Sequence, residues 1–341
     1  MGKTRRPLAE LHVHLNGTIE AARIVALASA AGREVPNGII TEGKFAWSDF
    51  PGFIDTMTFV SSFLRTPEDY RAQARSYLEQ VAADGGIYVE LSVAPTPALR
   101  NVGLDIPELF QAVAAGIEDA RRATGIEGRI IALPLRHDGP EDAERIAKAI
   151  ARLGHPLCTG FGLAGNELAY TVEDFTRAFE IAHEAGIGCT IHAGEACGAE
   201  SVAAALRLPV TRIGHGVRSL EDDNVIAELV DRRIVLEVCP SSNLLLGFYP
   251  GAQSHPLPEL RRRGILCTIN SDDPTVFEST LAQEYDLVRS AMGMAEDDLR
   301  EMTRIAIDAA FVDEGTRSRL IQKAGLAASS AGIRTPADRR P

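Results

Sequence analysis

The chain has 341 residues, of which 45% are hydrophobic, and it carries a formal net charge of −12. Its 35 Lys and Arg residues are scattered, so the basic face that nucleic acids and anionic membranes require is not expected. Five cysteines without CxxC spacing predict neither a disulfide framework nor a thiolate zinc site. The N-terminal segment does not resemble a signal peptide, and no apolar stretch reaches the roughly 18 residues of a membrane span. We therefore expect a soluble, cytoplasmic protein that acts on a small molecule.

Short apolar segments recur along the chain, and each is followed by a segment with helical spacing. Eight strand candidates occur in order, at residues 8–14, 87–95, 129–136, 158–165, 188–195, 212–216, 233–240 and 266–274. Apolar residues three and four apart predict amphipathic helices, among them residues 67–85, 141–154 and 171–186. Apolar strands that alternate with helices predict a parallel sheet covered on both faces. Eight such units favour an α/β fold of the (β/α)8 TIM-barrel type, with a doubly wound sheet as the alternative.

A long insertion, at about residues 15–86, separates the first two strands. It contains the aromatic cluster of residues 45–59, which includes the only Trp. The insertion is expected to be helical, either as a subdomain with its own small core or as a lid over the barrel mouth. We expect residues 1–341 to form a single domain that ends in a flexible tail at about residues 329–341.

Ionisable residues collect where the predicted strands end: His12 and His14, His192 and Glu195, His215, and Asp272 and Asp273. In a barrel these strand ends converge on one mouth, so residues about 260 positions apart can share a site. Three imidazoles and a carboxylate are donors that zinc accepts, with room for a water. Each motif alone has an ordinary structural explanation, such as an Asp-Pro turn. Together they predict a metal site.

Two carboxyl groups beside this site suggest proton transfer. Glu195 follows His192 by three residues, and a carboxyl walled from solvent has a raised pKa, which suits a proton donor. Adjacent aspartates in NSDDP, Asp272 and Asp273, point to different sides, so one can bind metal while the other contacts the attacking water.

Seven motifs resemble, in order, those of the adenosine deaminase family: LHVHLNG, YVELSVAP, GLAGNE, IHAGE, RIGHG, EVCPSSN and INSDDP. The resemblance covers about residues 8–320. Members of this family are zinc-dependent TIM barrels that hydrolyse the 6-amino group of purines. The resemblance therefore implies a single metal-dependent hydrolase domain that releases ammonia from an aminopurine.

The resemblance also implies roles for individual residues. One Zn2+ per chain would be bound by His12, His14, His192 and Asp272. Glu195 matches the residue that protonates purine N1, and His215 and Asp273 match the pair that orients and deprotonates the water. Gly165 matches a backbone contact to purine N3.

Other positions bear on the choice of substrate. The segment FPGFIDTM at residues 50–57 aligns with the hydrophobic lid of the family, which makes pocket candidates of Phe50, Phe53, Ile54 and Met57, although a core role explains them equally well. His14, Asn16, Gly165 and Asp273 are further substrate-binding candidates. Asn16 stands where adenosine deaminases have an Asp that contacts the ribose, and where adenine-specific relatives usually have Glu. The HLNG form also resembles relatives that act on N6-methyl-AMP. Gly162 and Asn166 replace Asp residues that adenosine deaminases commonly carry.

The leading hypothesis is a zinc-dependent hydrolytic deaminase that converts adenosine or deoxyadenosine to the 6-oxo product. The alternative is the same chemistry on adenine, an N6-substituted AMP or aminodeoxyfutalosine. A silent family member that binds nucleosides or acts as a growth-factor-like ligand is disfavoured, because the whole residue set is retained. The thiolate class of zinc deaminases is disfavoured by the absence of PCxxC. Iron, cobalt or manganese in place of zinc, and a monomer or a homo-oligomer, are left open.

Overall fold

The barrel strands are short, buried and parallel, as their apolar sequences require. The computed structural model describes residues 6–326, so the predicted tail lies outside the described residues. One run of hydrogen-bonded strands has the order β1-β4-β5-β6-β7, and the other has the order β11-β10-β9-β8. The barrel strands are β1 (Leu8–His14), β4 (Gly86–Val93), β5 (Glu127–Ala132), β6 (Cys158–Phe161), β7 (Gly188–Cys189), β8 (His192–Ala193), β9 (Arg212–His215), β10 (Val235–Val238) and β11 (Leu266–Ile269).

The two runs of strands join at both ends, which closes the barrel. β7 and β8 are halves of one interrupted strand, and the His192 N–H donates to the Leu163 carbonyl at 2.9 Å. At the other junction, the His14 N–H donates to the Asp272 carbonyl at 2.8 Å, and the Asp272 N–H donates to the His12 carbonyl at 3.2 Å. The eight predicted strands are therefore present, and the TIM-barrel prediction is confirmed. Several end earlier than predicted, because their last residues turn into the loops that carry the site.

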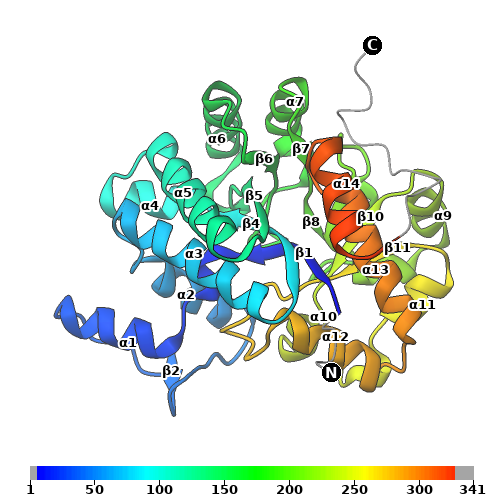
Figure 1. Cartoon of the computed structure of the whole chain (residues 1–341), viewed down its shortest axis with the longest axis horizontal. Helices are drawn as coiled ribbons and strands as arrows, with labels where there is room; N and C mark the ends of the chain where they lie inside the picture. Colours follow the sequence, from blue (N-terminus) through cyan, green and yellow to red (C-terminus); the bar gives the residue numbers. More distant parts are fainter. Residues whose placement is uncertain (1–5, 327–341) are drawn as a thin grey trace.

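Helices surround the strands (Figure 1). They are α1 (Ala21–Ala30), α2 (Phe50–Ser61), α3 (Pro67–Ala83), α4 (Pro95–Val102), α5 (Ile106–Thr124), α6 (Pro140–Leu153), α7 (Thr176–Glu184), α8 (Ala199–Ala205), α9 (Asp223–Asp231), α10 (Pro240–Leu245), α11 (Leu257–Arg262), α12 (Leu281–Ser290), α13 (Glu296–Ala309) and α14 (Glu314–Lys323). A capping box starts α3, because the Asp69 N–H donates to Thr66 Oγ1 and the Thr66 N–H donates to Asp69 Oδ2. Within residues 6–326, no helix is long and apolar enough to cross a membrane.

The insertion between β1 and β4 contains the short helix η1 (Leu15–Thr18), α1, the strand pair β2 (Ile40–Thr41) and β3 (Lys44–Phe45), α2 and α3. α1 and β2 stand outside the ring of helices, whereas α3 packs along α5 (Figure 1). The aromatic cluster is shared with the barrel, since the Trp47 ring lies 5.7 Å from both Phe53 and Phe277, measured between centroids. The boundaries of the insertion and its opening as a lid stay predictions.

Candidate metal centre and active site

Four side chains converge at the mouth of the barrel from the ends of β1, β8 and β11. The ligand atoms of His12, His14, His192 and Asp272 all lie within 4.8 Å of one another. Nε2 of His14 is 3.0 Å from Asp272 Oδ1 and 3.3 Å from His192 Nε2. Nε2 of His12 is 3.4 Å from the same Asp272 oxygen. The structure thus brings the four predicted ligands together as three nitrogens and one oxygen, a donor set suited to zinc.

The environment of His12 favours a positive charge. Its Nδ1 lies 2.9 Å from Glu237 Oε2, while its buried Nε2 makes no hydrogen bond to any described residue. Burial lowers the pKa of His12, but the nearby carboxylates of Asp272 and Glu237 outweigh it and raise the pKa to about 10. Donation of the Nδ1 proton to Glu237 leaves the Nε2 lone pair directed at the cluster. A metal cation can replace the proton there, so the residues fit a metal ion.

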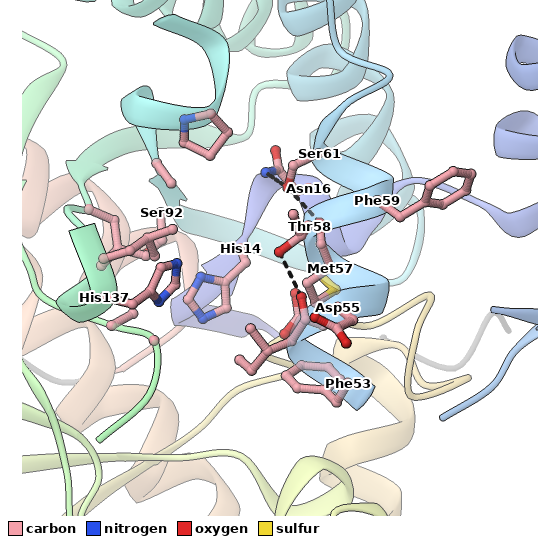
Figure 2. Close-up of a pocket in the computed structure, with 18 of the residues that line it drawn as sticks. His14, Asn16, Phe53, Asp55, Met57, Thr58, Phe59, Ser61, Ser92 and His137 are labelled. Carbon is pink, nitrogen blue, oxygen red and sulfur yellow. Dashed lines mark hydrogen bonds between the residues drawn. The ribbon is translucent and has the colours of Figure 1, made fainter. Parts of the chain in front are cut away.

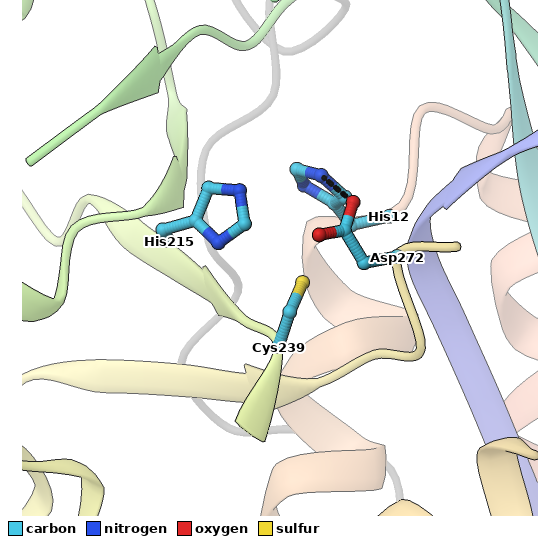
Figure 3. A group of neighbouring side chains, drawn as sticks. All are labelled: His12, His215, Cys239 and Asp272. Atoms are coloured by element: carbon cyan, nitrogen blue, oxygen red, sulfur yellow. Dashed lines mark ion pairs between the residues drawn. The ribbon is translucent and has the colours of Figure 1, made fainter. Parts of the chain in front are cut away.

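A second group of donors overlaps the first. His215 and Cys239 also lie near His12 and Asp272, with all four ligand atoms within 4.8 Å of one another (Figure 3). Burial, and then the nearby carboxylates of Asp272 and Glu195, raise the pKa of the Cys239 thiol well above its ordinary value. A protonated thiol is a poor ligand, because the thiolate is the form that binds metal. The group with three histidines and Asp272 therefore fits a metal better.

A cavity of about 540 Å3 opens beside the four predicted metal ligands. It is lined by every candidate for substrate contact predicted from sequence: His14, Asn16, Phe50, Phe53, Ile54, Met57, Gly165 and Asp273. Phe53 and Met57 lie along one side on α2, and His137 lies across from them (Figure 2). Sequence reasoning missed Arg33, Arg100 and His137 as lining residues.

Glu195 has the properties of a proton donor. The residue lines the cavity and is 7% exposed, with Oε1 3.6 Å from His215 Nε2. Burial raises its pKa well above the ordinary value, and the negative charges of Asp272 and Glu167 raise it further. The protonated form of the carboxyl group is therefore favoured, which suits a proton donor.

Asp273 has the properties of a base. It is 3% exposed, and its Oδ1 makes no hydrogen bond within the described part of the chain. Burial raises its pKa to about 7, with a further contribution from Asp272 that opposes the lowering by His14. Gly17 permits the close approach of the first loop, because a Cβ there would lie 1.9 Å from Asp273 Oδ1.

Two site residues have left-handed backbone conformations, with φ of 60° at His215 and 63° at Asp272. Such conformations are uncommon for residues other than glycine and cost about 1–3 kcal/mol each. Strain of this kind persists only where the surrounding structure holds it. Its presence after β11 and at the end of β9, where site residues lie, agrees with a site whose geometry matters.

A chain of hydrogen bonds, which sequence reasoning missed, orients His215. The Leu257 N–H donates to His255 Nδ1 at 3.2 Å, so neutral His255 carries its proton on Nε2, 3.3 Å from Asn243 Oδ1. The Asn243 amide nitrogen then faces His215 Nδ1 at 3.4 Å. Burial lowers the pKa of His215 to about 3. The neutral ring therefore carries its proton on Nε2, the nitrogen that faces Glu195.

Comparisons with known proteins agree with this site. The family model described as adenosine deaminase matches residues 7–325. The adenine deaminase of Agrobacterium fabrum is 45% identical over 318 residues, which are 93% of this chain and 97% of that protein. The crystal structure of an adenine deaminase from Arthrobacter aurescens superposes with a TM-score of 0.86 at 28% identity, covering 94% of this chain and 98% of that one. An amidohydrolase from Burkholderia ambifaria with bound zinc gives the same TM-score and identity, covering 94% of this chain and 90% of that one. The chain therefore belongs to the adenosine deaminase family and is a hydrolytic deaminase of purines that acts on a C–N bond.

Proposed function

We propose that this enzyme hydrolyses adenine to hypoxanthine and ammonia. The motifs pointed first to adenosine or deoxyadenosine, with adenine as an alternative, and the relatives named adenine deaminase favour that alternative. The observation that carries the reaction type is the buried carboxyl of Glu195, whose pKa is raised by burial, in a cavity beside a group of residues that could hold a metal ion.

We assign one Zn2+ per chain to His12, His14, His192 and Asp272. A bound Zn2+ lowers the pKa of a coordinated water to about 7. Support for zinc comes from the donor set and from the zinc in the Burkholderia relative.

Three side chains then take part in proton transfer or hydrogen bonding during the reaction. Glu195 donates its proton to the purine ring nitrogen N1, which makes the adjacent C6 electrophilic and gives the ring electrons a place to go. Asp273 accepts a proton from the attacking water, and the Nε2–H of His215 donates a hydrogen bond to the oxygen of that water. Asp273 passes the proton it took from the water to N6, and the C6–N6 bond breaks to release ammonia. The hydroxyl hydrogen at C6 is lost as the C6 carbonyl forms, which restores the proton of Glu195, so adenine and water yield hypoxanthine and ammonia.

Asn16 supports a free base as substrate. Its Nδ2 donates to Ser61 Oγ at 2.6 Å, and the Ser61 hydroxyl donates to the Met57 carbonyl at 2.7 Å (Figure 2). Because the serine proton is already committed, the amide of Asn16 keeps Oδ1 as an acceptor. Adenine has an imidazole N–H that a nucleoside has lost to its sugar, so an acceptor at this position suits the base.

The substrate is tested with adenine, adenosine, deoxyadenosine, AMP, N6-methyl-AMP and aminodeoxyfutalosine, by ammonia release and by the ultraviolet change to the 6-oxo product. We expect kcat/KM for adenine to exceed that for adenosine by at least about 100-fold, because a site built around the base N–H rejects analogues that lack it. A preference for adenosine would instead support the nucleoside assignment. No turnover of any compound by metal-loaded enzyme would contradict the proposal.

Glu237→Gln is expected to weaken metal binding by about 10- to 100-fold, because a carboxylate that orients a ligating imidazole has effects of this size. Glu237 accepts from His12 Nδ1 at 2.9 Å and is also paired with Arg212 at 2.7 Å. Metal affinity is measured by competition with a chelator of known affinity. Glu284→Gln is the matched control, since Glu284 is equally buried but bonds Ser241 and Ser279 instead of a ligand. Equal affinities in the two variants would show that Glu237 does not orient His12.

A further inference from the structure

The carboxylate of Glu167 collects the hydrogen-bond donors of the loop that carries Glu195. Glu167 follows β6 and is 7% exposed. Its Oε1 accepts from the Gly194 N–H at 2.6 Å and from the Ser201 hydroxyl at 2.6 Å. Its Oε2 accepts from three successive backbone amides, those of Glu195 at 3.2 Å, Ala196 at 2.8 Å and Cys197 at 2.8 Å.

This loop has little regular structure to hold it. β8 ends at Ala193, and Gly194 turns the chain with a left-handed φ of 69°. A Cβ at position 194 would lie 2.4 Å from Val202 Cγ2, so the turn is also tightly packed. Four consecutive amides point to one carboxylate, and hydrogen bonds to a charged acceptor are about twice as strong as neutral ones. The Glu167 carboxylate thus replaces the sheet or helix bonds that these amides lack.

We propose that Glu167 is a positioning residue that fixes residues 194–197 so that the Glu195 carboxyl faces the substrate. The inference rests on the proposed role of Glu195 in the proposed function. Because Glu167 lies on the loop after β6 and Glu195 lies after β8, the contact joins two loops at the barrel mouth. A second bond holds the start of the same segment, where Arg136 Nη2 donates to the His192 carbonyl at 2.8 Å. The Glu167 side chain works through Glu195 and takes no part in the bond changes.

Glu167 also contributes to the electrostatic environment of Glu195. The carboxylates of Asp272, Glu167 and Asp273 face Glu195 and raise its pKa. The imidazole of His12 lowers that pKa, and His215 lies 3.6 Å from the Glu195 carboxyl. Removing one negative charge therefore lowers the pKa of Glu195. Since the protonated form is the proton donor, the basic limb of the kcat profile moves to lower pH when Glu167 is neutralised. A role in folding alone would not move this limb.

The test compares Glu167→Gln and Glu167→Asp with the wild-type enzyme, using adenine as substrate. Glutamine has nearly the same shape but presents one NH2 group to the amides, whereas aspartate keeps the charge on a shorter side chain. We expect Glu167→Gln to lower kcat by about 100-fold, with a smaller change in KM, because a misplaced catalytic group has an effect of this size. Glu167→Asp should recover part of that loss. Metal content should stay at the wild-type value in both variants.

Amide hydrogen exchange tests the role of Glu167 in a second way that needs no substrate. The amides of residues 194–197 should exchange at least about 10-fold faster in Glu167→Gln, since loss of their acceptor favours local opening. Glu200→Gln is the matched control, because exposed Glu200 lies nearby and accepts from the Gly198 N–H, which is outside the segment of residues 194–197. That control should keep the wild-type kcat and exchange rates.

Two results would overturn the inference. One is a Glu167→Gln enzyme with a kcat within about threefold of the wild type and an unmoved basic limb. The other is a loss of activity that matches a loss of bound metal or of folded protein. If the wild-type enzyme does not turn over adenine, the proposed function fails, and the exchange arm still decides whether Glu167 holds the loop.

Discussion

Glu195→Gln is expected to lower kcat on adenine by about 100- to 10,000-fold, the range that general acid catalysis contributes. The amide has nearly the shape of the carboxyl group but cannot transfer a proton to N1. Metal binding should be unchanged, because the four assigned ligands do not include Glu195. The measurements are kcat and KM from ammonia release, together with the metal content of the purified variant.

The pH dependence gives the same experiment a second readout. The pKa of Glu195 is raised above its ordinary value, so the proton donor is present below that pKa and is lost as the pH rises through it. Asp273, with a pKa of about 7, must be ionised to act as the base, so its ionisation sets the acidic limb of the profile. A bound cation would shift this acidic limb to lower pH. The wild-type profile should be bell-shaped, and Glu195→Gln should lose the basic limb. Near-full activity of the metal-loaded variant would contradict the role of Glu195.

His192→Ala is expected to abolish both metal binding and turnover. Loss of a direct ligand should cost more than the roughly 10- to 100-fold in affinity that loss of an outer hydrogen-bond partner costs. Burial, and then the nearby imidazoles of His12 and His215, lower the pKa of His192 well below its ordinary value, so the ring is a neutral ligand at pH 7. The variant is compared with the wild-type enzyme before and after chelation and zinc return. His183→Ala is the control, because that histidine is exposed on α7.

Thermal unfolding distinguishes a ligand from a core histidine. A metal that binds only the folded protein raises its stability in proportion to the logarithm of the metal concentration over Kd. The wild-type Tm should therefore fall on chelation and recover with zinc, while the Tm of His192→Ala should not respond to zinc. Restored turnover of His192→Ala at ordinary zinc concentrations would exclude His192 from the ligand set.

Much of the architecture was predictable because it depends on local patterns. The strand predicted at residues 8–14 is observed as Leu8–His14, and the helix predicted at residues 67–85 is observed as Pro67–Ala83. Apolar runs and capping residues act over a few positions, so they can be read directly. The strand predicted at residues 188–195 is interrupted between Cys189 and His192 and ends at Ala193. The chain then turns at Gly194, and Glu195 lines the cavity.

The supporting residues of the site were not predictable in the same way. Glu167, Glu237 and Asn243 each contact a site residue through a hydrogen bond that spans the fold or a loop, and His255 acts through Asn243. No spacing rule links Glu237 to His12, which is 225 positions away. An acidic residue inside an otherwise apolar strand, or in the loop that follows one, is the signal that could have marked Glu237 and Glu167.

The sequence by itself determined the type of chemistry. Histidines and acids at the ends of predicted parallel strands must meet at one barrel mouth, whatever the details of packing, because all such strands end on the same side. Only the tertiary structure decided the protonation of these groups and the orientation of their rings. The raised pKa values of Glu195 and Asp273 arise first from burial, and the charge of Asp272, which is far from Glu195 in the sequence, raises the pKa of Glu195 further. Such effects depend on distance in space and on exclusion of water, and neither exists until the chain has folded.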